Sequence, residues 1–306
     1  MLTTTEYQNI TIEPFGEEHE PFYMKLKELS KVDDQEHIHP AKSEIAFVAL
    51  ADGVPAGLIF TYHRPFHPYC TYISLLVLPS SDRMLIASRL LMSLSAQRMV
   101  YPLQISVWET DFAMKQALVK QGFYEIRNTY NVHIATSQRG FIRDEEYFMN
   151  HHSDYELLSL SEFLEREQGE EELVRLVKKT YEHTHRANPP GVFDLSRWKA
   201  FLHEQDLESR GSYVVLNSTN GHCAGFALLH STSEDGVAEL GWRGVASSEP
   251  LDLILLLTRE QMNYAADNGI KQLTCEVDST DPYQMEMLHV YPFEPAPAWV
   301  TYHKQR

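Results

Sequence analysis

Two glutamates occupy places in this sequence where a carboxylate could accept a proton. Glu239 lies within the strand-like segment Val237–Trp242, and Glu109 directly follows the strand-like segment Leu103–Val107. A carboxylate beside an apolar cleft becomes more basic, which suits it to take a proton from an amine. Either glutamate is therefore a candidate proton acceptor. The alternative, a glutamate on a solvent-exposed strand face, stays open for both.

One segment of the chain carries positive charge without acids. Between Arg83 and Trp108 there is no Asp or Glu, although the whole chain has 26 Lys and Arg against 43 Asp and Glu, a formal net charge of −17. Such a segment can hold an anionic ligand, and its alternative is a solvated helix face. The acidity of the whole chain argues against nucleic acid and anionic membranes as partners, and it favours a cationic amine over an anionic one.

The sequence gives little support for a metal site or a disulfide framework. Fifteen histidines include closely spaced pairs, but none has a Cys or carboxylate at recognisable zinc spacing, so we expect no metal. The pairs are His37/His39, His63/His67, His151/His152 and His183/His185. The three cysteines are far apart, which fits a reducing cytosol rather than a disulfide framework. We expect a cytoplasmic protein, because no signal segment or membrane-length apolar run is present.

The sequence repeats itself at an offset of about 170 residues. Leu103-x-x-x-Val107-x-x-Thr110-Asp111 matches Leu273-x-x-x-Val277-x-x-Thr280-Asp281. Asp52-Gly53-x-x-Ala56-Gly57 matches Asn220-Gly221-x-x-Ala224-Gly225. Because the matches fall in the same order, a duplicated domain is the favoured interpretation, and one large α/β domain is the alternative.

The repeat predicts the elements that must position these residues. Each half should contain a hairpin, a central buried strand, a helix, a parallel strand, an Asp-capped helix and closing strands. In the first half we expect Tyr72–Leu78, Met84–Met99, Leu103–Val107, Phe112–Lys120 and Tyr124–Ile134. In the second half we expect Tyr213–Leu216, Gly225–His230, Val237–Trp242, Leu251–Ala266, Leu273–Val277, Pro282–Val290 and Ala298–His303.

This order of elements resembles the GNAT N-acetyltransferase superfamily. The resemblance rests on the strand ending Leu75-Leu76-Val77-Leu78-Pro79, the helix and strand after it, the Asp-capped helix and Gly122-Phe123. It is clearest from Glu44 to Ile126 and weaker from Tyr213 to His303. It implies tandem α+β domains, each a mixed, mostly antiparallel sheet with flanking helices, at 1–145 and 146–306.

The resemblance also implies a cofactor and the residues that hold it. Acetyl-CoA would lie between two parallel strands that splay apart, with its pyrophosphate at the N-terminus of the following helix. Mapped onto this chain, the cofactor-binding residues are Leu76, Val77, Leu78, Arg83, Met84, Leu85, Ile86, Ala87 and Asp111. Glu239 falls where many members present a carboxylate to the amine, so the resemblance implies that it is the stronger candidate general base. Glu109, at the end of the second splayed strand, is the weaker one.

The chain departs from the family pattern at several positions. The Arg or Gln of the usual pyrophosphate loop is replaced by Asp82, and the second-half loop contains no glycine. The tyrosine that protonates the leaving thiolate in many members is Leu118 in one half and Leu288 in the other, and leucine has no proton to donate.

These observations lead to two functional hypotheses. The first is an acetyl-CoA-dependent N-acetyltransferase that acts on a small-molecule amine by direct attack on the thioester. The alternative is a catalytically silent protein of this fold that binds acyl-CoA or another ligand, or serves as a dimerising scaffold. The sequence leaves the choice between monomer and homodimer open.

Overall fold

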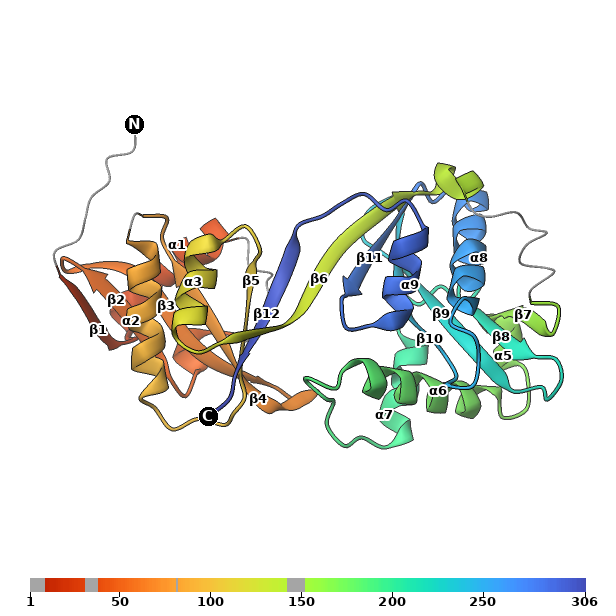
Figure 1. The fold of residues 1–306 in the computed structure, drawn as a ribbon, viewed down its shortest axis with the longest axis horizontal. Coiled ribbons are helices and arrows are strands. Elements are labelled where there is room, and N and C mark those ends of the chain that lie inside the picture. Colours follow the sequence, from red (N-terminus) through yellow and green to blue (C-terminus); the bar gives the residue numbers. More distant parts are fainter. Residues whose placement is uncertain (1–8, 31–37, 81, 142–151) are drawn as a thin grey trace. The chain divides into compact units, whose positions relative to one another are not determined.

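The computed structural model describes residues 9–30, 38–80, 82–141 and 152–306 (Figure 1). Those residues divide into two compact units. Unit 1 comprises residues 1–127 and 299–306, and unit 2 comprises residues 128–298. Within the described residues, no helix combines the length and the apolar character needed to cross a bilayer.

Unit 1 is a mixed sheet with helices against it. Its strands follow the order β1-β2-β3-β4-β5-β12, and only β4 and β5 are parallel neighbours. The elements are β1 Ile10–Pro14, α1 Glu20–Ser30, β2 Ala46–Ala51, β3 Val54–Arg64, β4 His67–Val77, α2 Arg83–Ser95, β5 Leu103–Trp108, α3 Phe112–Lys120 and β12 Ala298–Lys304.

The two faces of the unit 1 sheet are covered by different helices. Leu58 and Phe60 of β3 pack with Tyr23 and Leu26 of α1 in a buried cluster. Gly57, the residue before Leu58, faces Ile86 and Leu90 of α2 instead. Since successive strand residues point to opposite faces, α1 and α2 lie on opposite sides of β3.

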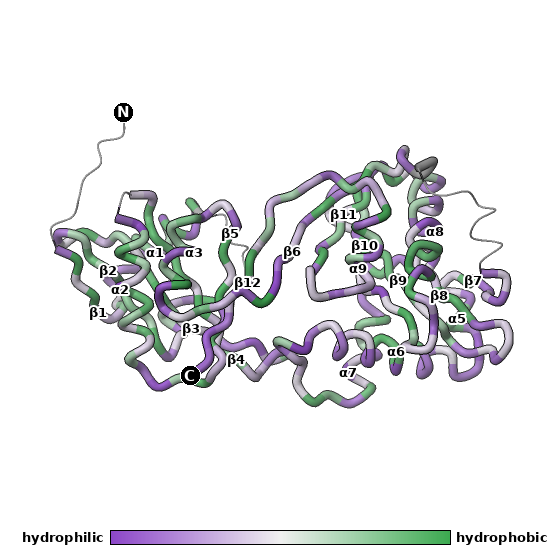
Figure 2. The backbone as a smooth tube through the Cα atoms, viewed as in Figure 1, coloured by the Kyte–Doolittle hydropathy of each residue, from purple (hydrophilic) through white to green (hydrophobic). Residues whose placement is uncertain are grey.

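Unit 2 repeats this arrangement. Its strands follow the order β7-β8-β9-β10-β11-β6, and only β10 and β11 are parallel neighbours. The elements are β6 Tyr124–Ala135, β7 Tyr155–Ser159, α5 Leu160–Leu164, α6 Gly169–Thr184, α7 Leu195–Ala200, β8 Tyr213–Asn217, β9 Cys223–Ser231, β10 Val237–Val245, α8 Leu253–Asp267, β11 Gln272–Asp278 and α9 Pro282–Val290. The hydrophobic runs along β8 and β9 are visible in Figure 2, and α8 and α9 pack with these strands in one large core.

The last strand of each unit does not come from the stretch of chain that the repeat suggests. The expected closing strand of the first half, β6, pairs with β11 from Thr129 to Ala135. The expected closing strand of the second half, β12, pairs with β5 from Trp299 to Lys304. The compact units therefore differ from the expected division at 1–145 and 146–306. The hydrogen-bonding partner of an edge strand is set by contacts that its own sequence does not encode.

Candidate functional site

The two parallel strands of unit 1 separate as the resemblance implies. Their register consists of Thr71 opposite Leu103 and Tyr72 opposite Gln104, and no pair beyond these joins them. A cavity of about 520 Å³ lies at their carboxyl ends, beside the start of α2. It is lined by Pro79, Ser80, Arg83, Met84, Trp108, Thr110, Asp111, Phe112 and Ala113.

Three of the predicted cofactor residues line this cavity: Arg83, Met84 and Asp111. The other six are not among the residues that line it. Leu76 and Leu78 pack with the cluster under α1, while Val77, Ile86 and Ala87 are buried on the α2 side or within α2, and Leu85 is exposed. For these residues the prediction is that the backbone groups, and not the side chains, contact the cofactor.

Charge at this cavity is organised around one ion pair. Arg83 is the first residue of α2, and both of its terminal nitrogens bond the carboxylate of Asp111, at 2.8 and 3.0 Å. Asp111 also caps α3 by accepting from the Met114 backbone N–H. The Nε of Arg83 is buried without a hydrogen-bond partner. An anion at the N-terminus of α2 would meet this guanidinium and the positive end of the helix dipole.

Glu109, the weaker candidate base, lies at the edge of this region. It follows β5 directly and is exposed, and its backbone carbonyl accepts a hydrogen bond from Lys115 at 3.3 Å. Its carboxylate is outside the set of nine residues that line the cavity.

Unit 2 has the same separation of parallel strands, with Glu239 at its start. The pairing of β10 with β11 ends at Glu239 opposite Thr274. Glu239 lines a cavity of about 180 Å³ at this point, together with Glu276, Asp278 and Asp281. The predicted base is therefore placed at a cavity, although its side chain is exposed.

Aromatic residues form another wall of the unit 2 cavity. Tyr181 stacks on His185, with ring centroids 3.7 Å apart, and meets Trp242 at 4.8 Å. Carboxylates together with aromatic faces attract ammonium groups. His185 belongs to the pair His183/His185, and its Nδ1 lies near the Thr184 hydroxyl at 2.9 Å.

Two charged residues that line this cavity, Asp281 and Arg243, have unusual electrostatic environments. Burial raises the pKa of Asp281 to about 6, although backbone N–H groups of Gln284 and Tyr283 donate to its carboxylate and oppose that shift. Arg243 also lines the cavity and is only 3% exposed. A buried guanidinium and a partly buried carboxyl with a raised pKa therefore line the same cavity.

The start of α8, where a second pyrophosphate would lie, is acidic. Glu249 accepts hydrogen bonds from Tyr155 at 2.7 Å and Asn217 at 3.5 Å, and Asp252 lies 3.5 Å from His152. The Tyr283 hydroxyl donates to the Val245 carbonyl at the end of β10, at 3.4 Å. That carbonyl is one of the strand groups that an extended cofactor arm would use.

Comparison with solved structures decides the fold. A GCN5-related N-acetyltransferase from Sphaerobacter thermophilus matches with a TM-score of 0.64 at 14% identity, over 98% of this chain and 96% of that one. This chain has the GNAT N-acetyltransferase fold. A tandem GNAT protein from the clavulanic acid biosynthesis pathway matches with a TM-score of 0.50 at 12% identity, over 96% of this chain and 98% of that one.

A third GNAT relative is part of a longer protein. It is the glucosamine N-acetyltransferase region of a fungal multi-domain GH3 β-N-acetylglucosaminidase, with a TM-score of 0.59 and 11% identity. The match covers 98% of this chain and 38% of that one. No family model matches the sequence, and no curated protein matches it. At these identities the likeness establishes the fold, and activity has to be argued from the residues.

The positions of the missing GNAT tyrosines are apolar in the structure. Leu118 of α3 is fully buried, and Leu288 of α9 is partly buried against the unit 2 core. Neither can protonate a thiolate.

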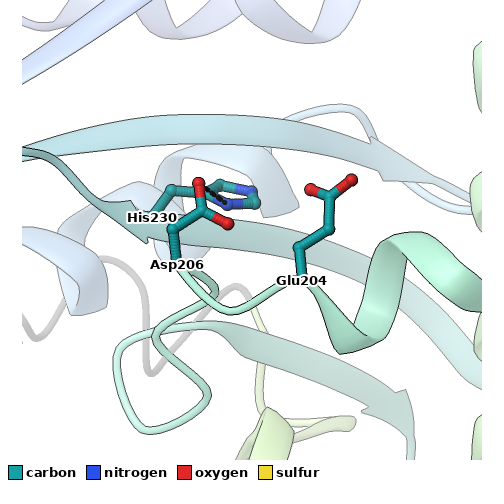
Figure 3. Close-up of side chains that lie close together, drawn as sticks. All are labelled: Glu204, Asp206 and His230. Atoms are coloured by element: carbon teal, nitrogen blue, oxygen red, sulfur yellow. Dashed lines mark ion pairs between the residues drawn. The ribbon is translucent and has the colours of Figure 1, made fainter.

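One cluster has the composition of a cation site. Glu204, Asp206 and His230 each offer a ligand atom, and these atoms lie within 4.8 Å of one another (Figure 3). His230 Nδ1 lies 3.5 Å from the Asp206 carboxylate. The three could hold a divalent ion after small side-chain shifts. His230 was not among the closely spaced histidine pairs considered in the sequence. Its acidic neighbours in the structure, Glu204 and Asp206, lie more than twenty residues earlier in the chain, so no local spacing pointed to this cluster.

Two further residues were missed by the sequence reasoning. Arg243 is the single charged residue in Leu240–Val245. An isolated charge in an otherwise uncharged strand could have marked it as a candidate site residue. Trp242 carried no comparable signal, since its contacts with Tyr181 and Phe201 depend on the placement of α6 and the turn after α7.

Proposed function

We propose that this protein is an acetyl-CoA-dependent N-acetyltransferase that acts on a small-molecule amine, with the cofactor held by unit 1. The observation that carries the proposal is the 520 Å³ cavity at the separated ends of β4 and β5, beside the N-terminus of α2. Arg83 lines this cavity and can meet phosphate, and β4 beyond Tyr72 has no pairing with β5, which leaves that edge open to an extended cofactor arm.

The reaction would need few protein groups. A neutral amine attacks the thioester carbonyl, a C–N bond forms, and the C–S bond breaks as coenzyme A leaves as a thiolate. The proton lost by the amine goes to a carboxylate, directly or through a water molecule. With leucine at position 118, the thiolate takes its proton from solvent or from that carboxylate.

Two carboxylates are candidates for this step, one in each unit. Glu109 follows β5 in the unit that offers the cofactor cavity, whereas Glu239 lines the cavity of unit 2. The chain's net charge of −17 supports a cationic amine as acceptor.

A thiol-release assay on the full-length protein tests the proposal. Acetyl-CoA is supplied with a panel of small amines, and release of free thiol that depends on an added amine supports transfer. Glu109→Gln and Glu239→Gln then identify the unit that provides the base, by a loss of about tenfold or more in kcat/KM. Glu167→Gln, a change at an exposed glutamate, is the matched control.

The buried Leu118 favours a second function, which is binding without turnover. In that case coenzyme A binds to the full-length protein, Arg83→Ala abolishes the binding, and no amine in the panel accelerates thiol release. Failure of coenzyme A to bind at millimolar concentration contradicts both functions.

A further inference from the structure

Arg243 is a buried cation, and three of its five N–H donors have no hydrogen-bond partner. Its Nη1 donates to the Thr258 hydroxyl at 2.8 Å and lies 3.0 Å from the Met287 sulfur. Its Nε and Nη2 are buried and have no hydrogen-bond partner. A buried donor left unpaired destabilises the protein, and a charged one does so more strongly. Such a group calls for an acceptor, and the described residues provide none for these two nitrogens.

The two unpaired nitrogens identify the shape of that acceptor. Nε and Nη2 lie along one edge of the guanidinium, and their N–H bonds run parallel. This edge matches the two oxygens of a carboxylate, which it binds through two hydrogen bonds at once.

Asp281, an acid whose charge acts on Arg243, is already engaged elsewhere. The Asp281 carboxylate accepts from the backbone of Tyr283 and Gln284 at 2.8 and 3.2 Å, and it forms no ion pair with Arg243 within 4 Å. It caps α9 rather than neutralising the arginine.

The cavity that Arg243 lines also limits the size of the ligand. A cavity of about 150 Å³ can hold a benzene molecule. The space here is about 180 Å³, so it takes a compact ligand and not a nucleotide. The acidic start of α8, with Glu249 and Asp252, argues further against the phosphates of coenzyme A in this unit.

The rest of the lining favours positive charge on the same ligand. Glu239, Glu276 and Asp278 line the cavity, and Tyr181 and Trp242 form its aromatic wall. An anion without a compensating positive charge would be repelled by these carboxylates. We therefore propose that the cavity of unit 2 binds a compact amino-carboxylate, with its carboxylate on the Nε/Nη2 edge of Arg243 and its ammonium group among the acids and aromatic rings. This goes beyond the transferase proposal, because it holds whether or not unit 1 transfers an acyl group.

Isothermal titration of the full-length protein tests this site. The probes are glycine, β-alanine, γ-aminobutyrate and 5-aminovalerate, which increase the spacing between the two charges, together with butyrate and butylamine. We expect at least one amino acid to bind at least tenfold more tightly than both single-charge probes. Saturating coenzyme A should leave this affinity unchanged, which separates the site from the cofactor cavity of unit 1.

Two variants separate recognition from folding. Arg243→Met removes the charge and keeps an apolar side chain in a buried place, a change that proteins often tolerate. It should abolish amino acid binding while the melting temperature stays near that of the parent. Arg175→Met changes an exposed arginine on α6 and should bind as the parent does. If Arg243→Met is unfolded, the single-charge probes decide: butylamine binding as tightly as every amino acid overturns the proposal. So does the absence of binding by all four amino acids, or unchanged binding by folded Arg243→Met.

Discussion

Arg83 and Asp111 form a two-point ion pair that joins the first residue of α2 to the N-cap of α3, with N–O distances of 2.8 and 3.0 Å. Both residues line the cavity proposed for the cofactor. The arginine that would meet the phosphates is therefore partly neutralised by the chain, and the acid would lie close to any bound anion.

Replacing Asp111 with asparagine should strengthen coenzyme A binding. Asparagine caps a helix as well as aspartate does, so α3 keeps its start, while the negative charge beside Arg83 is lost. We expect the affinity for coenzyme A to rise about fivefold, which corresponds to about 1 kcal/mol. Isothermal titration of the full-length protein measures it.

The repeat supplies the control for this experiment. Asp281 is the residue of unit 2 that matches Asp111, and it caps α9 in the same way. Asp281→Asn should leave coenzyme A binding unchanged, because the cofactor is assigned to unit 1. Equal gains in Asp111→Asn and Asp281→Asn would mean that both units bind the cofactor.

The local elements were predictable because their signals are local. The apolar run Tyr72–Leu78 is β4 from His67 to Val77, and Asp111 caps α3 as expected. The helix expected over Met84–Met99 ends at Ser95, where the N–H of Ala96 bonds back to Met92 and Leu94. What the sequence could not show is the partner of each closing strand. A strand pattern indicates which residues face inward, but not which edge the strand joins.

The candidate site was predictable only in part, for a similar reason. Arg83 and Asp111 were both predicted among the cofactor-binding residues, and Asp111 also as a helix cap. Their ion pair was not predicted, because it depends on the packing of α2 against α3. Glu239 was identified from its strand position. The role of Arg243 depends on Thr258 and Met287, which come from two different helices.

The stability of unit 2 should fall as the pH rises. Burial raises the pKa of Asp281 from 3.8 to about 6, so the folded state binds this proton more tightly than the unfolded state does. That contribution is complete below about pH 4 and is lost as the pH passes 6, up to about 3 kcal/mol. Asp281→Asn should remove it. Urea denaturation at pH 4 and pH 7.5 should show the variant gaining stability relative to the parent at the higher pH; an equal difference at both would contradict the shift.

Unit 1 should show the opposite dependence. Burial lowers the pKa of His303 to about 4, and its Nε2 lies 2.8 Å from the Gln104 side-chain oxygen. The unfolded state takes up this proton near pH 6.5, so stability is present above that pH and is lost as the pH falls toward 4, up to about 3 kcal/mol. His303→Gln keeps a donor for Gln104 and should flatten the acid limb of the urea midpoint against pH. His289→Gln, at an exposed histidine, should leave that limb unchanged.

The repeated Ala-Gly motif has a packing role that the structure explains. A Cβ at Gly57 would lie 2.8 Å from Ile86 Cγ2 and 3.1 Å from Leu90 Cδ1, so α2 can approach β3 only over a glycine. At Gly225, the matching position, a Cβ would lie 3.0 Å from Val245 Cγ1 and 3.1 Å from the Gly244 carbonyl.

Gly57→Ala should therefore destabilise the protein by overpacking, by about 1–3 kcal/mol in urea denaturation. Gly225→Ala should act in the same direction, because its contacts are also shorter than ordinary van der Waals separations. In Gly16→Ala the new Cβ meets only the flexible Glu18 side chain, so this control should stay near the parent. Ile86→Ala combined with Gly57→Ala should cost less than the sum of the two single changes, since the smaller side chain vacates the space that the new methyl group needs. Additive costs would show that the close approach of α2 to β3 is not what the glycine provides.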